Sequence, residues 1–389
     1  MTQRRKFQLC SQRLEDRTVL AGNVNVVLAG VNLKITGDAD ANDITIVRTD
    51  ATHLQITGNN GTNILLNGAG AAGVQTVTVA DFTKLILGVK LEGGNDVVTL
   101  GQLAGNEIEV KGLKIETGIG ADTVTVQNVF MSGTLQGQIM ARKVNTATEA
   151  DADVVNIHDS GFVGGVKIFT GFGGDTVTVD QATQVDKVLN IDTSGGDDVV
   201  TINQVTTNKA AVIALGDGND TGTFNQITLN GTAGITKVSG GAGIDNINAS
   251  NIIAQHALQI DLEKTSSGTS NNMLTATNIQ AAKITVNGGG GVDQILAGSI
   301  VAPTMVVKGN GGSDQISATQ INSNKSLTVD AGAGDNDVVA ASLLTAPVGL
   351  VVDGGAGIGD TLNFTLAGST LPPSFGFNSP KNFETKNIA

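Results

Sequence analysis

The stretch from Thr117 to Val126 reads TGIGADTVTV, and the stretch from Thr170 to Val179 repeats it as TGFGGDTVTV. A glycine-rich turn leads to an aspartate, and a strand of alternating apolar and polar residues follows it. The phrase returns about once every 24 residues from Asp96 to Asp360. The repeated aspartates lie at positions 96, 122, 153, 175, 198, 220, 245, 293, 314, 337 and 360, and Asn272 fills one missing place. A fixed period of this length is typical of a stacked repeat protein.

Alternation within the strand indicates which side chains point inward, because successive residues of a β-strand face opposite sides. The second residue after each aspartate is apolar and is expected to stack in a buried column: Val98, Val124, Val177, Val200, Ile247, Ile295 and Ile316. We therefore predict an all-β fold, a right-handed parallel β-helix (β-solenoid) of about 12 coils, with the aspartates in one axial column. Parallel coils about 4.8 Å apart would make a rod on the order of 55 Å long.

The segments outside the regular repeat differ from it in composition. Residues 1–21 carry basic residues and Cys10, and we expect them to lie outside the folded body. Residues 22–90 contain strands at irregular spacing, which predicts an N-terminal β cap with atypical coils, since an open solenoid end exposes core and strand edge. Residues 91–366 form the solenoid, and residues 367–389, rich in phenylalanine and proline, form a C-terminal cap or tail.

The charge of the chain argues against nucleic acid as a partner, and its hydropathy argues against a transmembrane helix. The net charge is −13, and no arginine follows Arg142, so the chain lacks the clustered basic residues that bind nucleic acid. No stretch approaches the length of apolar sequence that a transmembrane helix requires. One cysteine allows no internal disulfide bond.

Three turns resemble the GGxGxD core of hemolysin-type (RTX) calcium-binding repeats: GGAGID from Gly240 to Asp245, GGGGVD from Gly288 to Asp293, and GNGGSD from Gly309 to Asp314. The resemblance implies Ca²⁺ held between the turns of successive coils by backbone carbonyl and carboxylate oxygens. In that family the sequence repeats about every nine residues, with two turns in each coil, whereas this chain has one turn about every 24 residues. The resemblance implies these metal ligands: Asp175, Asp198, Asp220, Asp245, Asp293 and Asp314.

The alternative for the aspartates is structural. Each carboxylate would close its turn by accepting backbone N–H bonds, as in an Asx turn, with its charge facing water. Asn272 can make such bonds without a charge. Stacked carboxylates about 4.8 Å apart repel by about 0.9 kcal/mol per pair even in water, so either bound calcium or a structural arrangement must offset that repulsion.

The N-terminal segment bears on location. Leu14 to Leu20, LEDRTVL, resembles the LEPR-XLL segment of bacterial exported and surface proteins, with Asp16 and Val19 departing from that pattern. The resemblance implies an extracellular or cell-surface protein. We expect a non-enzymatic solenoid that binds calcium and serves a structural, adhesion or matrix role, with cell-surface or matrix components as partners.

The alternative is a polysaccharide-active lyase or hydrolase, since parallel β-helices host such enzymes. The chain has no Trp or Tyr for a sugar platform, and fold analogy alone does not establish an activity. His158 lies close in sequence to Asp151, Asp153 and Asp159, but His53 and His256 are too distant in the stack to complete a catalytic cluster with it. No catalytic residue is therefore expected.

Overall fold

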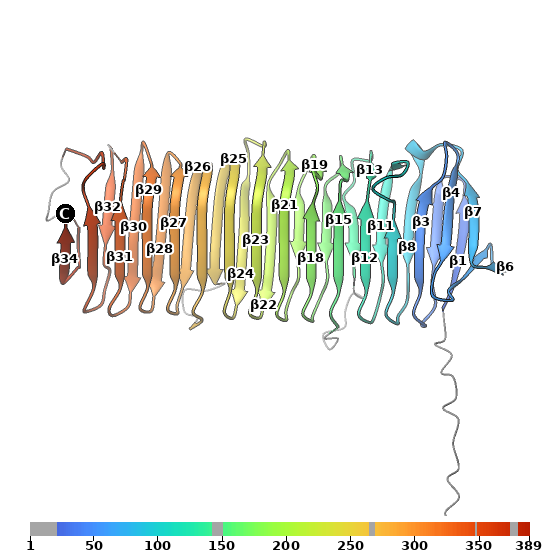
Figure 1. The fold of residues 1–389 in the computed structure, drawn as a ribbon, viewed down its shortest axis with the longest axis horizontal. Coiled ribbons are helices and arrows are strands. Elements are labelled where there is room, and N and C mark those ends of the chain that lie inside the picture. Colours follow the sequence, from blue (N-terminus) through green and yellow to red (C-terminus); the bar gives the residue numbers. More distant parts are fainter. Residues whose placement is uncertain (1–21, 142–150, 264–268, 347, 374–379) are drawn as a thin grey trace, which may run out of the picture.

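The computed structural model describes residues 22–141, 151–263, 269–346, 348–373 and 380–389. They form a stack of parallel coils with about 12 turns, in which 61% of the residues lie in strands (Figure 1). The chain runs along the rod from a group of hairpins at one end to the C-terminus at the other. The prediction of an all-β solenoid of parallel coils is confirmed.

The first arc of each coil begins directly after the repeated aspartate. Val177 pairs with Val200 of the next coil, and both side chains are buried, so the predicted register is confirmed. Short strands form only this arc, and longer strands form it with their first part. They are β3 (Asp43–Arg48), β9 (Val97–Leu100), β12 (Thr123–Gln127), β15 (Val154–His158), β18 (Thr176–Asp180), β21 (Val199–Thr207), β23 (Thr221–Leu229), β25 (Asn246–Glu263), β26 (Met273–Gly289), β27 (Gln294–Val301), β29 (Gln315–Asn322), β31 (Val338–Ser342), β33 (Thr361–Thr365) and β34 (Thr385–Ile388).

A bend with left-handed backbone ends the first arc, six residues after the aspartate. The residues with positive φ at this bend are Asn128, Asp159, Gln181, Gln204, Gln226, Asn251, Asn278, Ser299, Gln320 and Leu343. Asparagine tolerates this conformation, whereas leucine is disfavoured there. The second arc follows the bend as separate short strands in the N-terminal half: β10 (Ile108–Val110), β13 (Val129–Met131), β16 (Gly161–Phe162) and β19 (Gln184–Val185). From β21 to β29 it continues the strand of the first arc.

The third arc leads into the glycine-rich turn. Its strands are β2 (Asn32–Thr36), β8 (Ile86–Lys90), β11 (Gly112–Glu116), β14 (Gly137–Met140), β17 (Val166–Phe169), β20 (Leu189–Asp192), β22 (Ala211–Asp217), β24 (Ile235–Ala242), β28 (Thr304–Gly311), β30 (Ser326–Ala333) and β32 (Leu350–Asp353). The last parts of β25 and β26 supply this arc in their own coils.

The N-terminal end of the rod departs from the parallel pattern, whereas the last strands, β33 and β34, pair in parallel. At the N-terminal end, hairpins cover the first coils: β1 (Asn23–Ala29) is antiparallel to β2, β4 (His53–Gly58) to β3, and β7 (Val74–Thr78) to β4. The short β5 (Asn63–Leu66), β6 (Ala69–Ala72) and the 3-10 helix η1 (Phe82–Lys84) complete this region. At the other end Phe364 and Phe383 are buried, while Phe375 and Phe377 of the expected cap lie outside the described residues.

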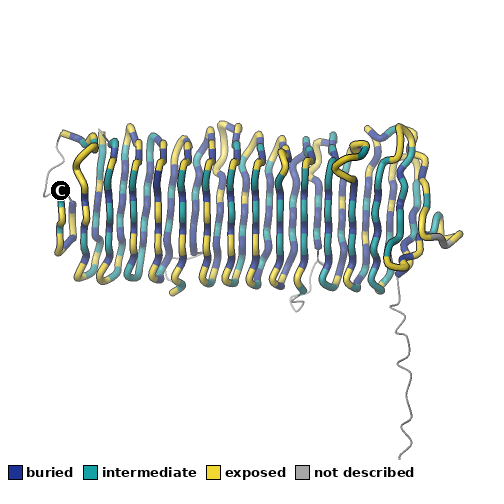
Figure 2. Tube along the Cα trace, in the orientation of Figure 1, coloured by how far each residue is buried: buried dark blue, intermediate teal, exposed yellow. Residues whose placement is uncertain are grey.

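One apolar core runs through the coils. Figure 2 shows buried and exposed residues alternating along the strands, as the sequence pattern requires. All seven residues of the predicted apolar stack are 0–1% exposed: Val98, Val124, Val177, Val200, Ile247, Ile295 and Ile316. The interior is therefore a packed column of Val, Ile and Leu side chains, against which any polar group must find a partner.

Candidate functional site

The turn before each aspartate brings neighbouring coils into close backbone contact. Gly241 has a φ of +132°, and a Cβ atom there would lie 1.5 Å from the carbonyl oxygen of Gly216 in the preceding coil. Gly243, with a φ of +125°, would meet the carbonyl oxygen of Gly218 at 1.9 Å. Only glycine fits at these two places. The glycine pattern that resembles calcium-binding repeats is thus required by coil stacking alone.

The eleven repeated aspartates lie in one column, in which Asn272 takes the missing place, and their side chains are buried. The six candidate metal ligands are 0–1% exposed: Asp175, Asp198, Asp220, Asp245, Asp293 and Asp314. Each Oδ1 atom accepts a hydrogen bond from the backbone N–H of the column residue in the preceding coil. The N–H of Asp175 donates to Asp198 over 2.7 Å, for example. The axial column predicted from Asp96 to Asp360 is confirmed.

Residues other than aspartate extend the column. Asn272 stands between Asp245 and Asp293 and accepts the N–H of Asp245 over 2.8 Å. Asn42 opens the column by donating its N–H to Asp96, and Glu384 ends it by accepting the N–H of Asp360. Sequence reasoning identified Asn272 but missed the two end members. Their signal was the alternating strand that follows each of them, DITIV and TKNI.

A second, exposed ladder runs beside the column, one residue earlier in the turn. The Oδ1 of Asn95 accepts the N–H of Ala121, that of Asp197 accepts the N–H of Asn219, and that of Asn219 accepts the N–H of Ile244. These bonds run in the opposite direction, since the N–H now belongs to the following coil. The inner and outer ladders together tie each such turn to its neighbours on both sides.

Burial dominates the electrostatics of the column. It raises the pKa of Asp153 to about 9 and that of Asp198 to about 8, and neighbouring column carboxylates add to both rises. The same cause raises the pKa of Asp245 to about 7 and that of Asp220 to about 6. The backbone N–H bonds favour the ionised form and offset only part of the effect. Column aspartates are consequently much weaker acids than aspartates in an unfolded chain.

One oxygen of each column carboxylate is already used in a hydrogen bond, which limits the ligands that the column offers to a calcium ion. Calcium takes about six to eight oxygen ligands, mostly from groups that can turn toward one point. Here each Oδ1 is already bonded to an N–H group of the neighbouring coil, and the carboxylates lie inside the rod. Within the described ranges, no group of three or more acidic, His or Cys side chains could hold a metal. Calcium binding by these aspartates stays a prediction from the sequence resemblance.

The structural alternative also differs from its expected form. The backbone N–H that each Oδ1 accepts belongs to the adjacent coil and not to the same turn, and the carboxylate is buried instead of facing water. The bonds therefore join coils rather than only closing a turn.

The three histidines lie apart and have separate partners. His158 contacts Asp180 of the next coil through Nδ1. His256 is buried, with Nδ1 at 2.6 Å from the carbonyl oxygen of Gly231 and Nε2 at 2.7 Å from the hydroxyl of Thr236. Both of its ring nitrogens are thus used in packing.

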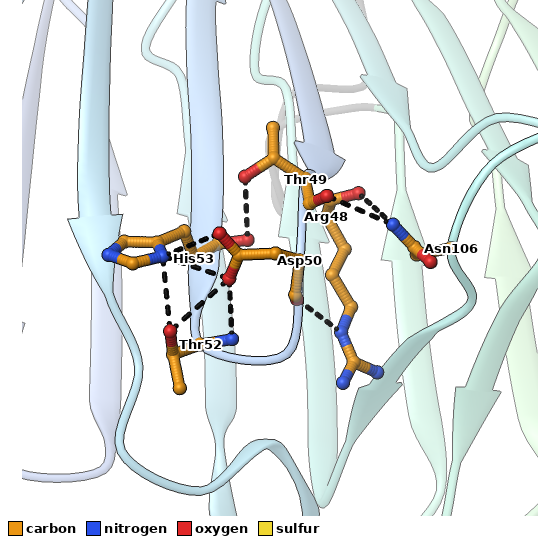
Figure 3. Close-up of polar contacts among 6 residues, drawn as sticks. All are labelled: Arg48, Thr49, Asp50, Thr52, His53 and Asn106. Atoms are coloured by element: carbon orange, nitrogen blue, oxygen red, sulfur yellow. Dashed lines mark hydrogen bonds and ion pairs between the residues drawn. The ribbon is translucent and has the colours of Figure 1, made fainter.

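The third histidine belongs to the N-terminal hairpin. Figure 3 shows His53 beside Asp50 in the turn that joins β3 to β4, where Arg48 and Asn106 link the hairpin to the next coil. The backbone N–H of Thr52 and the imidazole of His53 lower the pKa of Asp50 to about 2. The contacts of this exposed cluster stabilise the turn.

A groove of about 300 Å³ lies on the outer face of β26, β27, β29 and β31. It is lined by uncharged side chains, among them Met273, Leu296, Gln294, Gln315 and Ser317. General acid–base chemistry on a glycoside requires carboxylates or comparable groups beside the substrate. The lining of this groove supplies none.

Comparison of the chain with protein-family models, with curated proteins and with solved structures finds no match.

Proposed function

We propose that this chain is a non-enzymatic, exported or cell-surface β-solenoid that serves a structural role, as a stiff rod in adhesion or in an extracellular matrix. The LEDRTVL segment supports export, and the groove without acid–base groups gives the enzyme alternative no support. Within the described part of the chain, no helix is long and apolar enough to cross a membrane.

The observation that carries the structural role is the hydrogen-bonded column from Asn42 to Glu384. In a repeat protein each coil contacts only its neighbours, so stability is approximately a sum of interfaces. The residues that recur in every coil, the turn glycines and the aspartate, are used in those interfaces. The repeat is thus explained by the cohesion of a long rod, without a ligand.

Location is tested by labelling intact producing cells with an antibody against the rod. We expect surface labelling for the full chain, and retention inside the cell for a version that lacks residues 1–21. The shortened version should keep the melting temperature of the full chain, which separates a sorting defect from misfolding. Recovery of the full chain only in the soluble interior of the cell would refute the proposed location.

Calcium is tested separately. The candidate ligands are Asp175, Asp198, Asp220, Asp245, Asp293 and Asp314. Extracellular calcium modules bind with dissociation constants of about 0.1 to 1 mM, and a ligand that binds only the folded state raises stability. If the aspartates only join the coils, the protein should have the same melting curve in EDTA and in about 5 mM calcium. A calcium-dependent rise that Asp293→Asn abolishes would instead establish the metal site.

A further inference from the structure

The outer face of the first arc carries no charged side chain over its last eight strands. These strands, β23, β25, β26, β27, β29, β31, β33 and β34, pair in parallel with one another (Figure 1). The first, third and fifth residues after each column residue point outward. In these eight strands they are Thr, Asn, Ser, Gln, Gly, Ala, Val, Met and Leu, and the surface they form is called the neutral face below.

The neutral face contrasts with the other surfaces of the rod. In the third arc of the same region, Lys237 forms an ion pair with Asp261 over 3.1 Å. In the N-terminal part of the first arc, His158 contacts Asp180. The whole chain has a net charge of −13. Because two copies of an acidic chain repel each other through their charged surfaces, they approach most closely where both surfaces are uncharged.

A hollow lies in the neutral face, with large side chains on one side of it and small ones on the other. It is the groove of about 300 Å³ on β26, β27, β29 and β31. On the side of β26 and β27 its lining includes Met273 and Leu296, which are 40% and 43% exposed. On the side of β29 and β31 it includes the small residues Ser317 and Ala340. Apolar side chains thus project beside a space that could receive similar ones.

A two-fold axis along the strands, between β27 and β29, brings complementary residues of two copies together. It places β27 of one copy over β29 of the other, and β26 over β31, with the two rods antiparallel. Leu296 then faces Ser317 of the second copy, so a large side chain meets a small one. Gln294 faces Gln315, and each of their amides can both donate and accept a hydrogen bond. An isologous contact requires a self-complementary patch of this kind.

The size of the neutral face matches that of a stable interface. Eight strands about 4.8 Å apart, each contributing five residues of about 3.3 Å, cover about 38 Å by 17 Å, or about 650 Å². Two such faces bury about 1,300 Å² together, within the range of about 1,200 to 2,000 Å² of specific protein interfaces. Two sheets packed face to face lie about 10 Å apart with interdigitating side chains, which suits the large and small residues of the hollow.

We propose that the neutral face binds the same face of a second copy of this chain, in an antiparallel pair of rods with the two-fold axis between β27 and β29. The contact is a packing of two sheets with Leu296 and Ser317 at its centre. The N-terminal hairpins of the two copies point away from each other, outside the contact. This interaction goes beyond the proposed structural role and does not depend on where the rod is located.

Sedimentation equilibrium of the purified full chain over a wide range of concentrations tests the interaction. We expect a monomer–dimer equilibrium for the wild type. Ser317→Glu places a charge without a partner at the centre of the contact and should weaken dimerisation at least about 30-fold. Thr125→Glu is the matched control, because Thr125 pairs with Thr99 at the same place in the coil but lies in β12, outside the neutral face. It should dimerise as the wild type does.

A pair of opposite charges tests the arrangement of the two copies. Leu296→Lys alone should dimerise as weakly as Ser317→Glu. An equimolar mixture of these two variants should form a heterodimer, because the two-fold axis places the lysine opposite the glutamate. Both positions face outward, so circular dichroism should show each variant folded with about the melting temperature of the monomeric wild type. A mixture that stays monomeric would refute the antiparallel arrangement.

Three other results would overturn the proposal. They are a wild type that is monomeric at every concentration, a dimer that survives Ser317→Glu, and a dimer that Thr125→Glu abolishes. A monomeric wild type that sediments with insoluble cellulose, and loses this binding in Ser317→Glu, would assign the neutral face to an uncharged polysaccharide instead of a second copy.

Discussion

Replacing Asp293 by asparagine should leave the rod about as stable as the wild type near pH 4 and make it more stable near pH 8. The N–H of Asn272 donates to Oδ1 of Asp293 over 2.9 Å, and the N–H of Asp293 donates to Asp314 over 2.8 Å. An amide keeps both contacts, as Asn272 itself demonstrates one coil earlier. The variant removes only the capacity to ionise.

The magnitude follows from the pKa of Asp293. Burial, with a contribution from the nearby Glu263 carboxylate, raises this pKa from 3.8 to about 6. Each pH unit between the unfolded and folded values corresponds to about 1.4 kcal/mol. The wild type therefore loses about 3 kcal/mol of unfolding free energy from this group between about pH 4 and pH 8, and the asparagine variant does not.

The measurement is urea denaturation followed by circular dichroism at several pH values, in EDTA, with Asp186→Asn as the matched exposed control. The difference between variant and wild type should grow with pH, and the control should show no such trend. The dependence of unfolding free energy on urea should stay constant, so that the midpoint reports stability. An Asp293→Asn protein that is less stable than the wild type at pH 8 would refute the reasoning from burial.

Three further predictions concern the backbone and core. Leu343 has a φ of 52° and is 44% exposed, so Leu343→Asn should raise the unfolding free energy by about 1 kcal/mol. The reverse change at the equivalent bend, Asn278→Leu, should lower it by a similar amount. Urea denaturation measures both changes. Gly241→Ala should lower the unfolding free energy by at least about 3 kcal/mol, because its Cβ would meet a carbonyl oxygen of the preceding coil. Gly88→Ala, where a Cβ meets open space, should be neutral or slightly stabilising. Equal melting temperatures for these two variants would contradict the stacking argument. Val177→Ala in the buried stack should lower the unfolding free energy by about 2 kcal/mol through lost contacts and a cavity, and an unchanged denaturation midpoint would show that this site is not packed as described.

The sequence by itself determined the period, the register and the inward side chains. These are local properties: alternation assigns the face of each strand residue, and a glycine-rich turn at a fixed interval places equal positions over one another. The predicted burial of Val177 and Val200 followed from that pattern and is confirmed. The left-handed bend six residues after each aspartate was harder to foresee, because glutamine, serine and even leucine occupy it.

Only the tertiary structure decided what the aspartates contact. An aspartate after a glycine turn has the same sequence signature whether it binds calcium, closes its own turn or accepts an N–H from the next coil. The stacking of the coils shows the third of these contacts, because it brings the backbone nitrogen of Asp175 to 2.7 Å from the Oδ1 of Asp198 and leaves both carboxylates buried. The same stacking recruited Asn42 and Glu384, which lie outside the aspartate repeat and share only its place in the coil. Local chemistry thus specified the coil, and contact between coils determined the burial and the hydrogen-bond partners of its aspartates.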